Sequence, residues 1–235
     1  MLALTRAVKK GLAERADPER AAGQQAYMKS EMPYHGVATP GVTAICRAAF
    51  KAHPFETQDA WHEAMLDLWR QAEYREEKYA AEQLAAVRKY RAFQTMKTLP
   101  IYREFIVDGA WWDLVDGIVR RLGELLIDHP APMKKQMLKW STSRSLWQRR
   151  SAIICQLILK DQTDEDLLFR AISNNFDHPN FFVRKGIGWA LRDYSITAPE
   201  TVIAFIDEHK DELSPLSKRE GLKRLLKSGV VTEVP

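Results

Sequence analysis

Cysteine is scarce in this sequence, and long hydrophobic runs are missing. Only Cys46 and Cys155 occur among the 235 residues, and no CxxC pair is present. Two distant cysteines argue against a disulfide framework or a zinc site, and they fit a reducing compartment. Apolar runs such as residues 151–159 fall well short of the ~20 residues that a membrane helix needs. The N-terminus also lacks the apolar core of a signal peptide, so we expect a cytoplasmic protein.

The motifs of several common enzyme classes are absent as well. The sequence contains no P-loop, no dinucleotide-binding fingerprint, no HExxH and no GxSxG. The six histidines include no pair at metal-ligand spacing. Three of them, His53, His129 and His178, precede prolines in predicted turns. We therefore expect neither a metal nor an organic cofactor.

Helical periodicity dominates the chain, and no stretch shows the sustained alternation of a β-strand. We predict a single domain, residues 1–235, built from helices. Their approximate spans are 1–14, 18–30, 40–52, 57–70, 74–91, 98–108, 111–128, 131–139, 145–160, 164–175, 180–194, 199–210 and 215–228.

Capping residues and prolines mark where several of these helices begin. Thr163 and Asp164 are candidate caps of the helix predicted at 164–175. Three other starts combine a capping side chain with proline at the first helical position, namely Asp17-Pro18, Thr39-Pro40 and Ser214-Pro215.

The dipeptide His-Pro recurs in the chain, with gaps of 76 and 49 residues between its prolines. The first gap is close to two periods of ~38–40 residues, the length of a HEAT repeat. Paired short helices without a heptad pattern also favour a stacked solenoid over a four-helix bundle. We expect an all-α fold of HEAT-like repeats that forms a curved superhelix with a basic concave face.

Positive charge is concentrated in the second half of the chain, whose overall net charge is +4. Residues 1–117 carry 16 Lys and Arg against 16 Asp and Glu, whereas residues 118–235 carry 19 against 15. Residues 133–192 alone carry 11 against 5. Such a stretch suggests a polyanionic partner, with nucleic acid first, and a solvated basic surface is the alternative.

The most unusual segment is Trp-Trp-Asp-Leu-Val-Asp at residues 111–116. On a helix, Trp112 and Asp116 lie four residues apart and share one face. Trp111 lies on the neighbouring face with aliphatic residues, where it can be buried. The helix can thus present a tryptophan–carboxylate pair. For these residues alone, the simpler interpretation is two core tryptophans and two solvated aspartates.

Two further clusters combine tryptophan with cations. Trp147 and Arg150 lie three residues apart, and arginine can fork onto a phosphate. A surface arginine that covers a buried Trp147 is the alternative. Lys185, Trp189 and Arg192 fall on one helical face, as in nucleic-acid sites where aromatics stack and cations hold phosphates.

Other positions leave a choice between packing and binding. Gly186 and Gly188 each cost a helix roughly 1 kcal/mol relative to alanine, and we expect them to admit a neighbouring helix. Tyr27 can lie in a core or point into a cleft. Lys218 and Arg219 follow the start of the last helix, where N–H groups and cations bind phosphate, simple capping being the alternative.

Taken together, these residues resemble the AlkD-type family of alkylpurine DNA glycosylases. The resemblance runs from about Tyr27 to Lys223, and residues before 20 and at 31–52 match less clearly. Its specific pieces are Tyr27-Met28-Lys29, Trp111-Trp112-Asp113-x-Val115-Asp116, Trp147-x-x-Arg150, Gly188-Trp189-x-Leu191-Arg192 and Pro215-Leu216-Ser217-Lys218-Arg219-Glu220.

The resemblance implies HEAT-like repeats curved around DNA, and it assigns roles to five residues. Asp116 would be the catalytic carboxylate, with Trp112 and Trp189 beside it. Arg150 would grip a phosphate, and Tyr27 would lie near the lesion. From the clusters above, the expected DNA-binding set also includes Trp147, Lys185, Arg192, Lys218 and Arg219.

The activity that the resemblance implies is base excision repair of N3- and N7-alkylated purines in duplex DNA. These lesions include 3-methyladenine, 7-methylguanine and bulkier adducts. Such a base carries a fixed positive charge and leaves without an acid, so one carboxylate can stabilise the sugar and place a water. We see no lysine for a lyase step, and we expect a monofunctional hydrolase that does not flip the base into a deep pocket.

The expected partner is double-stranded DNA with alkylated purines. We expect it to be bound by a monomer without a protein partner or a membrane, at the nucleoid of a bacterial cytoplasm. Two alternatives stay open. One is a non-catalytic HEAT-repeat scaffold that binds DNA or protein. The other is a family member that binds branched DNA without cleaving it. Trp112, Asp116 and Trp189 favour the enzyme, since a scaffold has no reason to assemble them.

Overall fold

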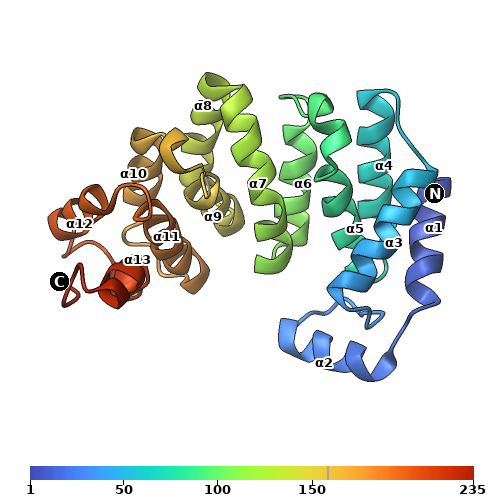
Figure 1. The fold of residues 1–235 in the computed structure, drawn as a ribbon, viewed down its shortest axis with the longest axis horizontal. Coiled ribbons are helices and arrows are strands. Elements are labelled where there is room, and N and C mark those ends of the chain that lie inside the picture. Colours follow the sequence, from blue (N-terminus) through green and yellow to red (C-terminus); the bar gives the residue numbers. More distant parts are fainter. Residues whose placement is uncertain (158) are drawn as a thin grey trace. The chain divides into compact units, whose positions relative to one another are not determined.

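The computed structural model describes residues 1–157 and 159–235 (Figure 1). These residues form thirteen α-helices and two short 3-10 helices without a strand, which confirms the predicted all-α class. The arrangement is consistent with HEAT-like repeats. The α-helices are α1 (Ala3–Ala13), α2 (Pro18–Met28), α3 (Thr39–Ala52), α4 (Gln58–Arg70), α5 (Arg75–Ala85), α6 (Leu99–Gly109), α7 (Trp112–Asp128), α8 (Pro130–Ser141), α9 (Leu146–Ile154), α10 (Glu165–Ser173), α11 (Phe181–Tyr194), α12 (Pro199–Glu208) and α13 (Pro215–Ser228).

Every predicted helical span overlaps one of these α-helices, but two of the spans run six residues past the end of their helix. The span 74–91 breaks after α5, and the 3-10 helix η1 (Arg88–Phe93) follows. The span 145–160 ends with α9, and η2 (Lys160–Gln162) follows a turn. Within that span, Ile158 lies outside the described residues. Gln156 leaves the helix because its side-chain amide exchanges two hydrogen bonds with the backbone of Asp164.

Most of the predicted caps are confirmed. Asp17 accepts a hydrogen bond from the backbone of Arg20, and Ser214 accepts one from Ser217. Asp164 likewise caps α10. The cap predicted at Thr39 is wrong, because α3 begins at Thr39 itself and the preceding alanine makes no side-chain bond.

The chain separates into two compact units, Met1–Phe105 and Ile106–Pro235. A single domain of residues 1–235 stays a prediction. In the first unit, α4 packs against α5 and α1 packs against α3. Trp61 and Trp69 of α4 are fully buried there, and the ring of Trp69 stacks on Phe105 at a centroid distance of 4.2 Å.

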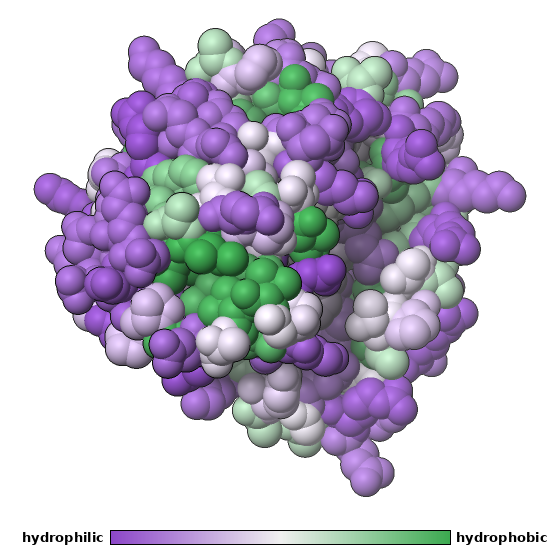
Figure 2. Space-filling model, turned by 60° about the vertical axis from the view of Figure 1, so that its left-hand side comes forward, coloured by the Kyte–Doolittle hydropathy of each residue, from purple (hydrophilic) through white to green (hydrophobic). Residues whose placement is uncertain are grey.

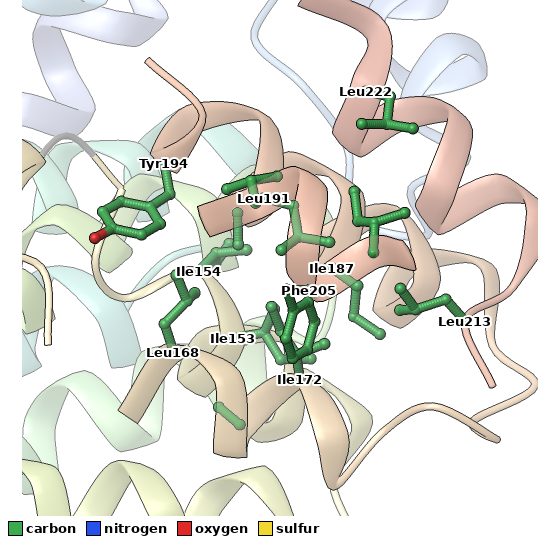
Figure 3. Packing of buried hydrophobic residues seen from close by; sticks show 14 of the residues in the cluster. Ile153, Ile154, Leu168, Ile172, Ile187, Leu191, Tyr194, Phe205, Leu213 and Leu222 are labelled. Carbon is green, nitrogen blue, oxygen red and sulfur yellow. The ribbon is translucent and has the colours of Figure 1, made fainter. Parts of the chain in front are cut away.

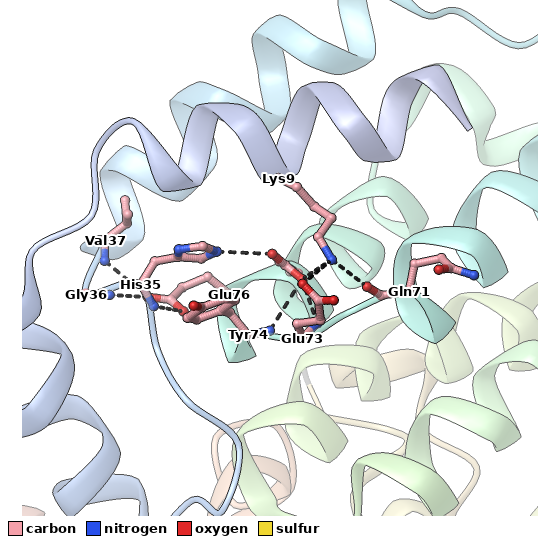
Figure 4. Close-up of polar contacts among 9 residues, drawn as sticks. Lys9, His35, Gly36, Val37, Gln71, Glu73, Tyr74 and Glu76 are labelled. Carbon is pink, nitrogen blue, oxygen red and sulfur yellow. Dashed lines mark hydrogen bonds and ion pairs between the residues drawn. The ribbon is translucent and has the colours of Figure 1, made fainter. Parts of the chain in front are cut away.

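A buried glutamate fixes the loop between α2 and α3 (Figure 4). The carboxylate of Glu76 accepts three backbone N–H bonds, from residues 35, 36 and 37, at 2.9–3.1 Å. Gly36 has a φ of +86°, and a Cβ there would lie 2.0 Å from the carbonyl oxygen of Asp17. Glycine and the three bonds together set where the chain leaves α2, the helix that carries Tyr27.

The core of the second unit is largely aliphatic, with Tyr194 and Phe205 among its buried residues (Figure 3). Side chains from α9 to α13, including Ile154, Ile187 and Leu222, pack into one cluster. Gly188 allows α11 and α13 to approach, since a Cβ at this position would lie 2.4 Å from the Cβ of Glu220. Close helix packing, our sequence-based interpretation of this glycine, is therefore confirmed.

Hydrophilic side chains cover most of the face shown in Figure 2, and hydrophobic ones gather in a patch on it. Tyr27 is the most exposed large hydrophobic residue of the described chain, at 77%, and Val230, Phe181 and Ile196 follow at 60%, 56% and 55%. No helix in the described ranges combines the length and the apolar character needed to cross a membrane.

Candidate active site

Helix α7 places Asp116 one turn from its start, four residues after Trp112. Leu114, Val115 and Ile118 turn the apolar face of the helix into the core, and all three are fully buried. The side chain of Asp116 is 16% exposed, and Trp112 is half-buried. Residues four apart on a helix share a face, so the predicted pairing of the two along α7 follows from the helix itself.

The carboxylate of Asp116 is held by Arg150, which comes from α9. Nε of Arg150 donates to Oδ1 of Asp116 at 2.9 Å, and Nη2 donates to Oδ2 at 2.7 Å. Nη1 of Arg150 donates to the carbonyl oxygen of Phe182 at 2.6 Å. The arginine side chain is only 5% exposed. A bidentate pair of this kind fixes both the position and the orientation of the carboxylate.

Trp189 of α11 completes the group. The guanidinium carbon of Arg150 lies 5.8 Å from the centroid of its ring. Gly186, one turn earlier, leaves room for the arginine, because a Cβ there would lie 3.3 Å from Nη1. Helix α9 packs against both α7 and α11, so the second unit brings Asp116, Arg150 and Trp189 together.

Burial raises the pKa of Asp116 above its ordinary value of 3.8. The hydrogen bonds and the positive charge of Arg150 lower the pKa, and the neighbouring charge of Asp113 raises it. Desolvation is the largest of these effects, so the net direction is upward. The site therefore holds a partly buried carboxylate whose ionised form depends on its arginine partner.

An aromatic cluster lies next to this group. Trp147 contacts Phe182 and Trp111 at centroid distances of 5.1 and 6.1 Å, and it is 7% exposed. We expected Trp147 to bind DNA, but its side chain is packed among other aromatic rings and faces little solvent. The structure therefore places Trp147 as a buried residue of α9, and DNA binding by Trp147 stays a prediction.

Lys185 and Arg192 meet a carboxylate that the sequence pattern alone does not reveal. Both form ion pairs of 2.7 Å with Glu220 of α13. The pKa of Glu220 is lowered from its ordinary value, and the hydrogen bond from Lys185 is the largest cause of that shift. The two cations flank Trp189 along α11, as the sequence predicted, and Glu220 neutralises part of their charge.

The remaining predicted contacts lie on other surfaces. Lys218 is half-buried and donates to the carbonyl oxygen of Lys210 at 2.8 Å, whereas Arg219 is exposed. Ser214 caps the start of α13, so the capping interpretation of this segment holds. Tyr27 is exposed on α2 in the first unit.

Sequence reasoning missed three groups that shape the site. These are the carbonyl oxygen of Phe182, the contact of Gly186 with Arg150, and Glu220. Only Glu220 gave a usable indication, because it is the sole acidic residue among the cations of residues 215–228. An isolated acid on a basic helix commonly has a cation partner when it is buried.

The family described as DNA alkylation repair enzyme matches residues 8–225, which span both units. The chain belongs to this family. A solved structure described as a predicted DNA alkylation repair enzyme from Enterococcus faecalis is 32% identical, with a TM-score of 0.78. The match covers 90% of this chain and 97% of that one. No protein of curated function matches the chain.

The family assignment confirms the predicted class, which is an enzyme family for the repair of alkylated DNA with DNA as substrate. The residues that match the family, 8–225, include all the segments that carry the sequence resemblance, from Tyr27 to Lys223.

Proposed function

We propose that the protein is a monofunctional DNA glycosylase that hydrolyses the N-glycosidic bond of N3- and N7-alkylated purines in duplex DNA. The observation that supports this most is the partly buried carboxylate of Asp116, clamped by Arg150 next to the ring of Trp189. A carboxylate fixed this firmly can act on a developing cation without reorganising. The family assignment supplies the substrate, alkylated DNA.

The chemistry needs only one carboxylate. An alkylated purine is already cationic, so the bond to the sugar breaks without an acid to protonate the base. The deoxyribose then gains oxocarbenium character, and the negative charge of Asp116 stabilises it and orients the attacking water. Glycosidases that cleave neutral leaving groups need a second carboxylate as an acid, and no such partner is required here.

Arg150 acts in this proposal mainly as the positioning residue of Asp116. We expected it to grip a phosphate, but its guanidinium is 5% exposed and three of its N–H groups are engaged. A phosphate contact requires the guanidinium to leave part of this network. Its positive charge also opposes the desolvation that raises the pKa of Asp116, and this favours the reactive ionised form.

Trp112 and Trp189 would line the sugar beside Asp116. The face of a tryptophan ring attracts cationic charge, which is worth ~0.5–2 kcal/mol depending on desolvation. Trp189 already lies within 5.8 Å of the Arg150 cation, so its ring is suited to positive charge. Such a site can act on a base that stays outside a deep pocket, and it can therefore tolerate bulky adducts.

Binding to the DNA backbone would rest on the exposed and half-buried cations of the second unit. Lys185 and Arg192 flank Trp189, and Lys218 and Arg219 lie in the first turns of α13. Tyr27 would meet DNA near the lesion. Each of these contacts should add to the salt dependence of binding, which measures the number of phosphates neutralised.

The test compares Asp116→Asn with Asp113→Asn in a duplex that carries one N7-methylguanine. Asp113 lies on the same helix, so its variant controls for the loss of one charge. We expect free 7-methylguanine and an intact abasic strand from the wild type and from Asp113→Asn. Asp116→Asn should bind the duplex and release little base. Equal release by both variants would remove Asp116 from the mechanism, and binding without release by the wild type would indicate a scaffold.

A further inference from the structure

The first unit contains a cavity of about 510 Å³ that the proposed reaction does not use. One wall is a single face of α3, with Cys46, Arg47, Phe50 and Lys51. The other wall is formed by the end of α5 and the start of η1, residues 83–90. All of its lining residues belong to the first unit, so the cavity is complete within that unit.

The rim of the cavity is cationic. Arg47, Lys51 and Lys89 are all exposed side chains that line it, and no described carboxylate forms an ion pair with any of them. The sequence has no Asp or Glu at all at residues 32–55 or at residues 83–103. Residues 1–117 carry equal numbers of basic and acidic residues, but the two kinds are not evenly distributed, and the acidic ones lie away from the lining of this cavity.

The acidic residues of α5 lie outside the lining of the cavity. Glu76, Glu77 and Glu82 are each less than 9% exposed, and none of them lines the cavity. Glu76 is occupied by the backbone of the loop at residues 35–37. Three solvent-facing cations without carboxylate partners favour the binding of an anion with more than one negative charge.

The floor of the cavity is apolar, and the rings of Phe50 and Tyr90 in it are largely buried, at 8% and 3% exposure. Phe50, Val87 and Tyr90 line it, and Tyr90 is held by stacking on Phe93 and by a hydrogen bond from the backbone of Phe55. Burial raises the pKa of the Cys46 thiol, also on the floor, to about 12, so this group stays neutral. Gln83 adds an amide at the side of the cavity.

We infer that this cavity binds an unpaired nucleotide, with its base against the apolar floor and its phosphates on Arg47, Lys51 and Lys89. A duplex backbone alone would satisfy the cations and leave the apolar recess empty. A nucleotide with an accessible base fills both parts, because its base packs into the apolar recess while its phosphates meet the cations, and single-strand sites likewise pair a cationic groove with a surface for the bases. The inference is independent of the proposed glycosylase reaction, because it concerns binding in the other unit.

The first test maps contacts directly in the full-length protein. An oligothymidine of about twelve nucleotides, a length within the range of single-strand sites, would carry one 4-thiothymidine for photocrosslinking. We expect crosslinks in the peptides that contain residues 43–54 and 83–90. Crosslinks confined to residues 106–235 would overturn the inference. Neither result depends on base release, so failure of this test is distinct from failure of the proposed reaction.

The second test separates the charged rim from the apolar floor. The variant Arg47→Ala, Lys51→Ala, Lys89→Ala should lower the slope of log affinity against log salt by about 2 for the single strand, which corresponds to three lost phosphate contacts. A matched control removes one arginine and two lysines that are exposed outside the cavity. It consists of Lys10→Ala, Arg15→Ala and Lys97→Ala, and it should leave most of the slope in place.

Ala86→Trp tests the recess without changing charge. Ala86 is exposed and lines the cavity, so an indole there can fill the space while the fold is kept. We expect single-strand affinity to fall about fivefold or more, the lower end of what one stacked base contributes, with duplex affinity unchanged. Ala13→Trp, at an exposed end of α1, is the control for an added surface tryptophan.

Competition identifies the source of the nucleotide. If thymidine monophosphate displaces the oligonucleotide, the site accepts a free nucleotide. If only longer single strands compete, it reads an unpaired nucleotide within a strand. Both outcomes support the inference. It fails if the triple variant weakens duplex and single strand equally while Ala86→Trp changes neither, because the surface would then be a simple backbone contact.

Discussion

Replacing Arg150 with methionine should destabilise the second unit in a way that depends on pH. Methionine keeps much of the length of the side chain and removes its charge and its three hydrogen bonds, two to Asp116 and one to the carbonyl oxygen of Phe182. The side chains of Arg150 and Asp116 are largely buried, at 5% and 16% exposure. The variant therefore leaves a carboxylate desolvated without its counter-ion.

The expected loss is about 3–5 kcal/mol in the free energy of unfolding near neutral pH, as for one partner removed from a buried pair. For a chain of this size that corresponds to a decrease in Tm of about 6–20 °C. Urea unfolding followed by tryptophan fluorescence is a suitable assay, because five of the seven tryptophans lie in the second unit.

The pH dependence has a definite sign. Burial raises the folded-state pKa of Asp116 above 3.8. Its contribution to stability is therefore fully present below that ordinary value and is lost as the pH rises through the folded-state pKa. Without Arg150 the pKa rises further, so the loss of stability relative to the wild type should grow as the pH rises above the ordinary value of 3.8.

Arg149→Met is the matched control. Arg149 makes hydrogen bonds only to neutral acceptors, such as the carbonyl oxygen of Ser143 and the side chain of Asn175. Its positive charge also lowers the pKa of His178, so any pH dependence of its variant should arise near the ordinary histidine value of 6.5 and not just above 3.8. If Arg150→Met behaves in the same way, or loses less than about 1 kcal/mol, the coupling of Arg150 to a buried Asp116 is refuted.

Three further predictions test other parts of the account. Gly188→Ala should lower the free energy of unfolding by about 1–3 kcal/mol, because the added Cβ overpacks against α13. Gly23→Ala is the control, since a Cβ there meets no atom within 4 Å, and it should be neutral or stabilising. Equal effects of the two variants in urea unfolding would contradict the close packing of α11 and α13. Arg219→Ala should lower the salt slope of duplex binding by about 0.9, and an unchanged slope would mean that this exposed side chain contacts no phosphate. Chelation of divalent metals should leave base release unchanged, since the proposed step uses only Asp116 and water, and loss of activity would count against it.

Much of the fold follows from local sequence rules. The apolar period of 3.6 residues located every α-helix, and Asp17, Asp164 and Ser214 cap helices because their side chains accept N–H bonds at the first turn. The end of α9 could not be read locally. The segment that follows is apolar and free of glycine and proline, and the chain turns because Gln156 bonds to the backbone of Asp164.

The site was predictable only along single helices. Trp112 and Asp116 share a helical face because they are four residues apart, and this spacing can be counted in the sequence. The pairing of Asp116 with Arg150 joins residues 34 apart, and tertiary packing alone decides it. The same holds for Glu220, whose contacts with α11 depend on the close approach that Gly188 allows.

The single-turnover rate of 7-methylguanine release from a duplex, measured against pH, tests the central claim most directly. We predict that release by the wild type rises with pH as Asp116 ionises, in a range above its ordinary pKa of 3.8. For Asp116→Asn we predict a low rate that does not rise in this range. Release that is equally fast in the variant, or none by a wild type that binds the duplex, would contradict it.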